Sequence, residues 1–475
     1  MTETILAPAF RYGRAKPASP NAELAANGVQ LAADQLDFRT VAQHMFNLML
    51  RNVSSDGFRF TDPVDPTQFA RPGCIIAAPS YPANAPGVDQ DYVFNWTRDA
   101  AVAAMEIAAA DVPVRPGGSV RPLIDYVTFA RTCQDNATPT LAHACYTIEG
   151  QSRPWTEQSD GPALQTLAIL AAWEQLDTAT QVLATEVIGT NLSFLLGAFR
   201  EQTTNLWEEH SGYSFFARAA QLKCLRAISV NTVGIAVPSG TGDAIAWLES
   251  ALRGHWDGTR YLSLIAEAPG GGSPSDPAGP GYDPNIDIVM ASIYGAIPVT
   301  DTRLLATAAL LRDQWADSTS PTAYPINVAD HDNLAIGPLM GRYPGDTYDG
   351  DMADHVIGGH PWALCTANFA ELYYRLAAEI TLSSPGGATP YDDLSSGFFA
   401  QVGINAGTAP SDAADALEAA GDAMLQAIVY HSDNLELSEQ FDGTSGYEKS
   451  VRNLTWSYAA YLSAVRAKSA RHVQG

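Results

Sequence analysis

Apolar residues recur at helical spacing along most of this 475-residue chain, and this pattern constrains the fold more than any other feature. Residues three or four apart share one face of a helix, so each such run predicts an amphipathic helix. Convincing alternating strands are few. We therefore predict an all-α fold of about twelve helices, arranged as a barrel of six helical hairpins with long active-site loops at one end. The runs cover residues 37–53, 98–110, 121–134, 161–176, 180–199, 214–229, 239–255, 300–315, 361–380, 412–431 and 450–468.

The segments before and between these runs indicate how the domain is organised. Residues 1–36 are rich in Ala, Pro and Asn and predict an extended N-terminal arm. Two long loops, residues 267–284 and 341–362, interrupt the periodic pattern, and loops of this length are usually functional. Typical N-cap residues precede three of the periodic runs. They are Asp37, Ser239 and Asp412.

The charge balance excludes several classes of function. The chain has 27 basic and 52 acidic residues, a net charge of −25, so it lacks the basic excess that would neutralise nucleic-acid phosphates. No apolar run approaches the roughly 20 residues that span a bilayer, so we expect no membrane partner. The N-terminal segment lacks a cationic region followed by an apolar core. We expect a cytoplasmic protein, or a secreted one if a signal peptide has been removed.

The cysteines and histidines give no sign of a metal site. The five cysteines form no CxxC motif, and their odd number argues against a dense disulfide framework. None of the nine histidines belongs to an HExxH motif. We therefore predict mostly free thiols, no metal and no cofactor. The cysteines are Cys74, Cys133, Cys145, Cys224 and Cys365.

Aromatic residues stand beside acidic and cationic residues at several junctions between a periodic run and a loop. The stretches are DYVFNWTRDA from Asp91, NLWEEH from Asn205, RYPGDTY from Arg342 and LSEQFDG from Leu437. Aromatic rings cover the apolar C–H faces of a pyranose, while Arg and Asp hold its hydroxyls through charge-assisted hydrogen bonds. Hydrolysis of a glycosidic bond needs two carboxyl groups, one that protonates the leaving oxygen and one that activates water or attacks carbon. The pattern indicates a carbohydrate site with catalytic carboxyl groups.

These stretches, together with QSDGPALQTLAIL from Gln158 and SVRNLTWSYAA from Ser450, resemble the glucoamylase family of glycoside hydrolases, family 15. The resemblance spans nearly the whole chain and implies an (α/α)6 barrel, here a single catalytic domain over residues 37–475. It implies an inverting exo-hydrolase, a glucan 1,4-α-glucosidase, that releases β-glucose from the non-reducing ends of starch, glycogen or maltooligosaccharides. We expect a monomer whose partner is this α-glucan or oligosaccharide substrate.

The resemblance assigns roles to individual residues. Glu208, the first glutamate of NLWEEH, matches the general acid, and Glu439 of LSEQFDG matches the general base. Glu209 matches a residue that holds substrate hydroxyls, and Arg98 and Asp99 match the pair that grips the outermost glucose. The other residues that we predict to bind substrate are Tyr92, Trp96, Trp207, Arg342, Asp346, Tyr348, Trp362 and Trp456.

Two departures from the family pattern fall where the leaving group would bind. The family often reads WGRPQxDGPA, whereas this chain reads PWTEQSDGPA, so Trp155 is one residue closer to Asp160. The segment from Tyr348 to His360 is expanded, and His360 replaces the usual Asn before Pro-Trp. These changes keep a related activity on isomaltose, α-1,6-glucan or trehalose open. A non-catalytic glucan-sensing barrel is the other alternative, although the chain retains both glutamates.

Overall fold

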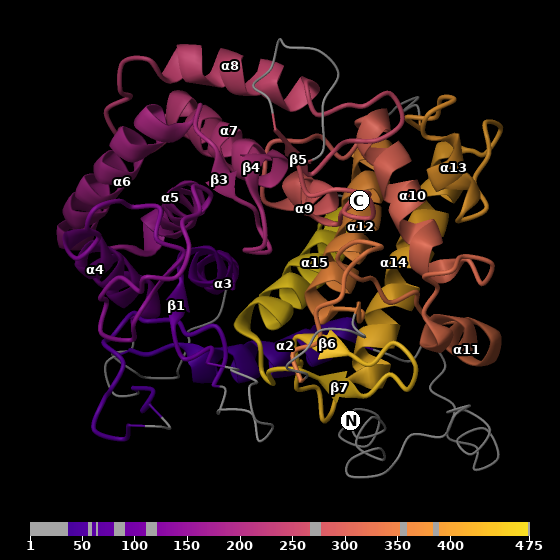
Figure 1. Cartoon of the computed structure of the whole chain (residues 1–475), viewed down its shortest axis with the longest axis horizontal. Coiled ribbons are helices and arrows are strands. Elements are labelled where there is room, and N and C mark those ends of the chain that lie inside the picture. Colours follow the sequence, from indigo (N-terminus) through magenta and orange to yellow (C-terminus); the bar gives the residue numbers. More distant parts are fainter. Residues whose placement is uncertain are drawn as a thin grey trace.

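Figure 1 shows the computed structural model of the chain, in which helices predominate. The structure describes residues 37–55, 59–62, 65–79, 91–110, 121–266, 277–351, 359–382 and 389–473. The predicted N-terminal arm over 1–36 lies outside the described residues, as do parts of both long loops, residues 267–276 and 352–358.

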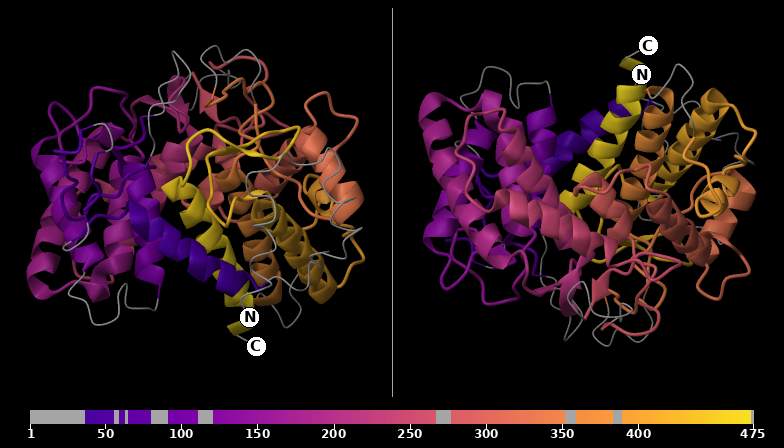
Figure 2. Two further views of the ribbon diagram at one scale, coloured as in Figure 1. Left: turned by 90° about the horizontal axis from the view of Figure 1, so that it is seen from below. Right: turned by 90° about the horizontal axis from the view of Figure 1, so that it is seen from above.

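Within the described chain, six helices form a closed inner ring, because each packs against the next and the last packs against the first. Figure 2 shows the early helices, coloured indigo to magenta, on one side of the molecule and the late ones, orange to yellow, on the other. The contact between α15 and α3 joins the two sides. In ring order the helices are α3 (Thr97–Ala109), α5 (Gly161–Ala172), α7 (Phe215–Val230), α9 (Asp287–Ile293), α12 (Ala363–Leu382) and α15 (Thr455–Val473).

Six further helices of the described chain pack around the outside of this ring. Outer and inner helices alternate in sequence, so the chain runs along the outside and returns through the ring each time. The inner helices therefore all begin at one end of the barrel. This arrangement is the predicted (α/α)6 barrel. The outer helices are α2 (Phe38–Met49), α4 (Pro122–Asp135), α6 (Thr178–Ala198), α8 (Thr241–Arg253), α10 (Thr302–Ala316) and α14 (Pro410–His431).

The degree of burial explains why periodicity predicted α2 and did not predict α9. Outer helix α2 buries the stripe Phe38, Val41, Met45, Leu48 and Met49, which has the spacing expected of a half-buried helix. Inner helix α9 has all seven of its residues buried, so it carries no polar face and no period. The predicted runs do not include α9 for this reason, nor do they include the short helices α11 (Pro325–Leu334) and α13 (Ser396–Ala400).

Short strands and turns at the ends of the helices complete the described fold. Strand β1 (Asn95–Trp96) pairs antiparallel with β2 (Cys145–Tyr146), and β6 (Gln440–Phe441) pairs antiparallel with β7 (Glu448–Lys449). A three-stranded sheet has the order β3-β4-β5. Its strands are β3 (Thr203–Thr204), β4 (Ser211–Ser214) and β5 (Leu264–Ile265), and the 3-10 helices are η3 (Leu50–Asn52) and η4 (Trp173–Gln175).

Only one of the three predicted helix caps is correct. The Asp37 side chain accepts a hydrogen bond from the backbone N–H of Arg39 at the start of α2. Helix α8 instead begins after Gly240, whose φ of 88° favours glycine, so Ser239 lies one position too early. Helix α14 begins at Pro410, which is pre-organised for a first helical position, and Asp412 lies in its first turn.

The structure bears on the state of the cysteines and on the presence of membrane-spanning helices. All five cysteines are buried free thiols, as predicted. In the part of the chain that the structure describes, no helix combines the length and the apolar character needed to cross a membrane.

The contact between α7 and α9 predicts a stability effect at Gly295. A Cβ on Gly295 would lie 2.6 Å from the Cβ of Ala219 on α7 and 2.6 Å from the carbonyl oxygen of Ala291. Gly295→Ala should therefore force the two inner helices apart and lower the free energy of unfolding by about 1–3 kcal/mol. Urea denaturation followed by circular dichroism would measure this change.

Gly189→Ala is the matched control for Gly295→Ala. Gly189 lies on the exposed side of α6, and a Cβ there would meet nothing within 4 Å. Because alanine favours the helix over glycine, this variant should be more stable by roughly 0.5–1 kcal/mol. Equal effects of the two substitutions would contradict the close packing of α7 and α9.

Candidate active site

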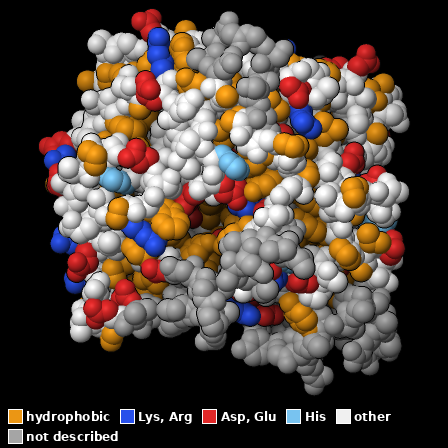
Figure 3. All heavy atoms as spheres, viewed as in Figure 1, with side chains coloured by type: hydrophobic (Ala, Val, Ile, Leu, Met, Phe, Trp, Pro, Cys, Tyr) orange, Lys and Arg blue, Asp and Glu red, His pale blue; other side chains and the backbone are white. Residues whose placement is uncertain are grey.

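A cavity of about 390 Å³ opens at the end of the barrel where the inner helices begin. Figure 3 shows a hollow in this face with hydrophobic and acidic side chains at its edge. Trp96, Arg98 and Asp99 reach the cavity from the start of α3, Leu364 from the start of α12, and Trp456 from the start of α15. Helix N-termini carry a partial positive charge, so this end of the barrel favours carboxylates and sugar oxygens.

The structure brings the predicted site residues together from distant parts of the sequence. Asp346 is the exception, because it is buried behind Arg342 and does not line the cavity. The predicted residues that line it are Tyr92, Trp96, Arg98, Asp99, Trp207, Glu208, Glu209, Arg342, Tyr348, Trp362, Glu439 and Trp456.

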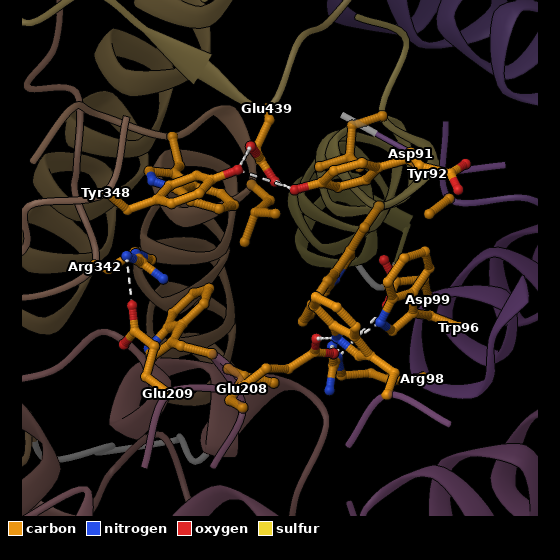
Figure 4. A pocket seen from close by; sticks show the side chains of 18 of the residues that line it. Asp91, Tyr92, Trp96, Arg98, Asp99, Glu208, Glu209, Arg342, Tyr348 and Glu439 are labelled. Carbon is orange, nitrogen blue, oxygen red and sulfur yellow. Dashed lines mark hydrogen bonds and ion pairs between the residues drawn. The ribbon is translucent and has the colours of Figure 1, made fainter. Parts of the chain in front are cut away.

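The two adjacent glutamates, Glu208 and Glu209, lie in a tight turn between β3 and β4. The backbone N–H of Glu208 donates to the carbonyl of Asn205 at 3.1 Å, and the N–H of Glu209 donates to the Asn205 side chain at 2.9 Å. Glu208 has a φ of 65°, in the left-handed region that non-glycine residues rarely adopt outside functional or strongly constrained sites. The turn points the two side chains toward different partners in the cavity (Figure 4).

Glu208 is held by two indole rings and faces one arginine. The Nε1–H of Trp96 donates to Oε1 at 2.7 Å, and the Nε1–H of Trp155 donates to Oε2 at 2.5 Å. An Nη atom of Arg98 lies 3.7 Å from Oε1. Glu208 keeps its side chain 17% exposed, so a ligand in the cavity can reach its carboxyl group.

Glu439 lies on the opposite wall of the cavity, above Glu208 in the view of Figure 4. Tyr92 donates to Oε1 at 2.9 Å, Tyr348 donates to Oε2 at 3.0 Å, and the Ser450 hydroxyl also donates to Oε2. Burial raises the pKa of Glu439 above the ordinary glutamate value, whereas these three donors and the Arg342 charge oppose the rise. The site thus supplies hydrogen bonds that favour the ionised form of a deeply buried carboxyl group.

Arg98 is buried among polar groups on the wall next to Glu208. It donates to Gln158 Oε1 at 2.8 Å and to Asp160 Oδ2 at 3.3 Å, and its Nε lies 3.5 Å from Asp99 Oδ2. That last pair is too long for a hydrogen bond, and both atoms are buried without a hydrogen-bond partner in the described residues. Unsatisfied buried polar atoms are costly, so sugar hydroxyls are suitable partners for them.

Burial has the largest effect on the pKa of Asp99, and neighbouring charges add smaller ones. Burial raises the pKa of Asp99 to about 7; the Arg98 charge opposes this rise, while the charges of Glu208 and Asp160 add to it. A group of this kind can accept a hydrogen bond from a sugar hydroxyl when ionised and donate one when protonated.

Arg342 forms a second fixed group on the far side of the cavity. Asp346 binds it in a bidentate fork, at 2.8 Å to Nε and 2.6 Å to Nη2, and Glu209 lies 2.9 Å from the same Nη2. Tyr343 donates to the other oxygen of Glu209 at 2.8 Å. The fork fixes the guanidinium in the plane that suits carboxylate and hydroxyl partners. Asp346 therefore positions Arg342.

Aromatic rings surround the Arg342 guanidinium and form the apolar wall of the cavity. Its central carbon lies 5.2 Å from the ring centre of Trp207, 5.1 Å from that of Tyr348 and 5.2 Å from that of Trp362. Trp456 covers Arg98 in the same way, at 5.1 Å. These rings combine cation–π contacts with faces on which a pyranose can pack.

Several residues of the site were not among the predicted ones. Gln158 and Asp160 hold Arg98, and Ser450 holds Glu439, yet a lone polar residue before a helix gives no distinctive signal in one sequence. Trp155, whose spacing to Asp160 departs from the family pattern, lies at the rim, where its indole N–H donates to Glu208 although the residue is 58% exposed. The other lining residues that sequence reasoning missed are Ala77, Asp91, Arg153, Leu206, Leu364 and Leu454.

Comparison with known proteins bears on both the fold and the family. The chain is 28% identical to glucoamylase 1 of Rhizopus oryzae over 80% of its own length, and it spans 65% of that protein. It is 25% identical to glucoamylase GLA1 of Saccharomycopsis fibuligera over 89% of this chain and 88% of the relative.

Solved structures show the same fold. A glucoamylase from Saccharomycopsis fibuligera superposes with a TM-score of 0.72 at 20% identity, over 98% of this chain and 99% of the other. A family 15 glucoamylase from Hypocrea jecorina superposes with a TM-score of 0.74 at 23% identity, over 92% of this chain and 73% of the other. The sequence also matches the glycosyl hydrolases family 15 over residues 46–466. The chain belongs to glycosyl hydrolases family 15.

Proposed function

We propose that this chain is an inverting, exo-acting glucoamylase that releases β-glucose from the non-reducing ends of starch, glycogen or maltooligosaccharides. The observation that carries the proposal is the pair of carboxyl groups on opposite walls of one cavity, Glu208 and Glu439, between two arginine groups that can hold sugar hydroxyls. Similarity to the glucoamylases described above supports the substrate class.

In this proposal, Glu208 acts as the general acid. The terminal glucose occupies the inner part of the cavity, where Arg98 and Asp99 hold its hydroxyls. Glu208 then protonates the glycosidic oxygen, so that the leaving sugar departs as an alcohol while positive charge develops on the anomeric carbon. Trp155 at the rim donates to the same carboxyl group and keeps it directed at the bond.

Glu439 acts as the general base on the other face of the sugar. It removes a proton from a water molecule, whose oxygen attacks the anomeric carbon as the bond to the leaving oxygen breaks. Attack from the opposite face inverts the configuration, so an α-linked substrate yields β-glucose. Tyr92, Tyr348 and Ser450 hold the carboxylate in the orientation that this step needs.

A second candidate function is hydrolysis of isomaltose, α-1,6-glucan or trehalose, and residues at the rim of the cavity support it. Trp155 and Tyr348 line the cavity, and the sequence departs from the family pattern at Trp155 and in the segment from Tyr348 to His360. Release of glucose from maltose, isomaltose and trehalose, measured side by side, tests the preference. Release from none of them, with binding retained, would instead support a glucan-sensing barrel.

The stereochemistry of the product tests the roles of the two glutamates. Proton NMR of fresh product from maltose should show β-glucose before mutarotation. Glu208→Gln and Glu439→Gln should each lower kcat by about 10²–10⁴-fold, the usual contribution of a positioned acid or base, while ligand binding changes little. Initial release of α-glucose, or full activity of the Glu439→Gln variant, would overturn the assignment.

If Arg98 donates hydrogen bonds to the hydroxyls of the terminal sugar, its removal should weaken binding of that sugar. Loss of one partner of a buried charged hydrogen bond costs about 2–5 kcal/mol, so Arg98→Ala should lower kcat/KM by roughly thirtyfold to several thousandfold. Arg121→Ala is the control, because Arg121 forms an exposed ion pair with Asp177. Near wild-type kcat/KM values for both variants would show that Arg98 does not hold the terminal sugar.

The environment of Glu439 predicts how the rate depends on pH. The base acts only when ionised, so kcat/KM should fall as the pH drops through its raised pKa. Ser450→Ala removes a donor that lowers this pKa, and the acidic limb of the profile should therefore move to higher pH. Ser292→Ala is the control, since its buried hydroxyl donates to the carbonyl of Val289. Identical profiles for the two variants would contradict the role of Ser450.

A further inference from the structure

The segment Asp349–Asp351 follows Tyr348 directly and packs against Gln440 of β6 and against Ser450, which follows β7. The Gln440 side chain donates to the carbonyl of Tyr348 at 3.1 Å and accepts from the N–H of Gly350 at 3.1 Å. The N–H of Ser450 donates to the Asp351 carboxylate at 3.0 Å. The packing is close, because a Cβ on Gly350 would lie 1.9 Å from the Ser450 hydroxyl oxygen.

Asp349 joins this segment to both of its neighbours through one carboxylate oxygen. Its Oδ2 lies 3.0 Å from Lys449 Nζ on β7 and 3.1 Å from His360 Nε2. The other ring nitrogen of His360, Nδ1, accepts from the N–H of Gly443 at 3.2 Å, so Nε2 carries the proton and donates. The Asp349 side chain is 4% exposed, and those of His360 and Lys449 are 13% and 18% exposed.

These contacts connect to Glu439 through its hydroxyl donors. Tyr348 immediately precedes Asp349, and Ser450 immediately follows Lys449. In the register of β6 and β7, Lys449 lies opposite Gln440, the residue that follows Glu439. The ion pair between Asp349 and Lys449 therefore joins the chain segments that supply two of the three hydroxyl groups seen to donate to Glu439 in the described chain.

We propose that Asp349, His360 and Lys449 form a clasp that positions the hydroxyls of Tyr348 and Ser450 on the general base Glu439. None of the three lines the cavity, so they are positioning residues and make no contact with substrate. The inference rests on the proposed function, because it takes Glu439 as the base. It also gives a role to Asp349 and His360, which lie in the expanded segment that departs from the family pattern.

Titratable groups from several elements face Glu439 and Asp349. Around Glu439 they are Tyr92 before β1, together with Tyr348 and Arg342 from the segment before α12. Around Asp349 they are Lys449 from β7 and His360 from the segment before α12, with Asp351 lying 3.8 Å from the same Lys449. The substitutions that test the clasp leave Tyr92, Tyr348 and Arg342 unchanged.

Lys449→Met and Asp349→Asn break the ion pair from its two sides. Hydroxyls displaced by a fraction of an ångström would hold Glu439 less well, so kcat on maltose should fall by roughly tenfold. The acidic limb of the pH profile should move to higher pH, because weaker donors stabilise the carboxylate less. KM should change much less than kcat, since Arg98 and Asp99 lie across the cavity (Figure 4). Lys449→Arg, which keeps the cation, should restore most of the rate.

Arg452→Met is the matched control. It removes one positive charge two residues beyond Ser450, but Arg452 is exposed and pairs with Asp433 and Glu448. Rates are normalised to the folded fraction, measured by near-UV circular dichroism at the assay temperature. A loss that vanishes on this normalisation would overturn the clasp, as would Lys449→Met and Asp349→Asn variants that match Arg452→Met.

The activity of the wild-type enzyme distinguishes a failure of the clasp proposal from a failure of the assignment of Glu439 as the base. A wild type that releases no glucose from maltose, isomaltose or trehalose would overturn the assignment of the base, and the clasp with it. An active wild type whose pH profile is insensitive to both clasp substitutions would overturn the clasp alone. A shifted profile with a preserved KM supports both.

Discussion

Six inner helices that begin at one end of a closed ring decide where chemistry can occur in this protein. The ring interior is filled by side chains, so polar groups gather at its ends, where backbone N–H groups of the first helical turns point outward. Glu208 precedes α7, Trp362 precedes α12, and Arg98 lies in the first turn of α3. Residues hundreds of positions apart meet for this reason, and the aromatic and charged stretches recur at helix starts along the sequence.

The fold was predictable to the extent that helices have two different faces. An outer helix such as α2 buries one stripe and exposes the rest, which leaves a period in the sequence. Helix α9 has neighbours on every side, so its residues are uniformly buried and its sequence shows no period. Helix starts were harder, because Gly240 and Pro410 begin helices through backbone conformation, whereas the predicted caps Ser239 and Asp412 act through side chains.

The site was predictable where residues of unusual chemistry stand together in sequence. Adjacent Glu208 and Glu209, and the neighbouring Arg98 and Asp99, are conspicuous and resemble a known family. Asp160 accepts a hydrogen bond from Arg98, 62 residues away, although an aspartate directly before a helix is ordinarily a cap. Ser450 acts through one hydroxyl that donates to Glu439. Their meaning depends on which chain segments lie beside them, and the three-dimensional structure supplies that information.

The turn that contains Glu208 constrains how this enzyme can change during evolution. Asn205 bonds to three successive residues across the turn, and Glu208 occupies a left-handed conformation within it. Inserting or deleting a single residue there would break these hydrogen bonds and move the Glu208 carboxyl group away from Trp96 and Trp155, which donate to it. Such length variants should be eliminated by selection. Evolutionary change in what the cavity accepts is therefore expected from substitutions of its lining residues and not from changes of length in this turn.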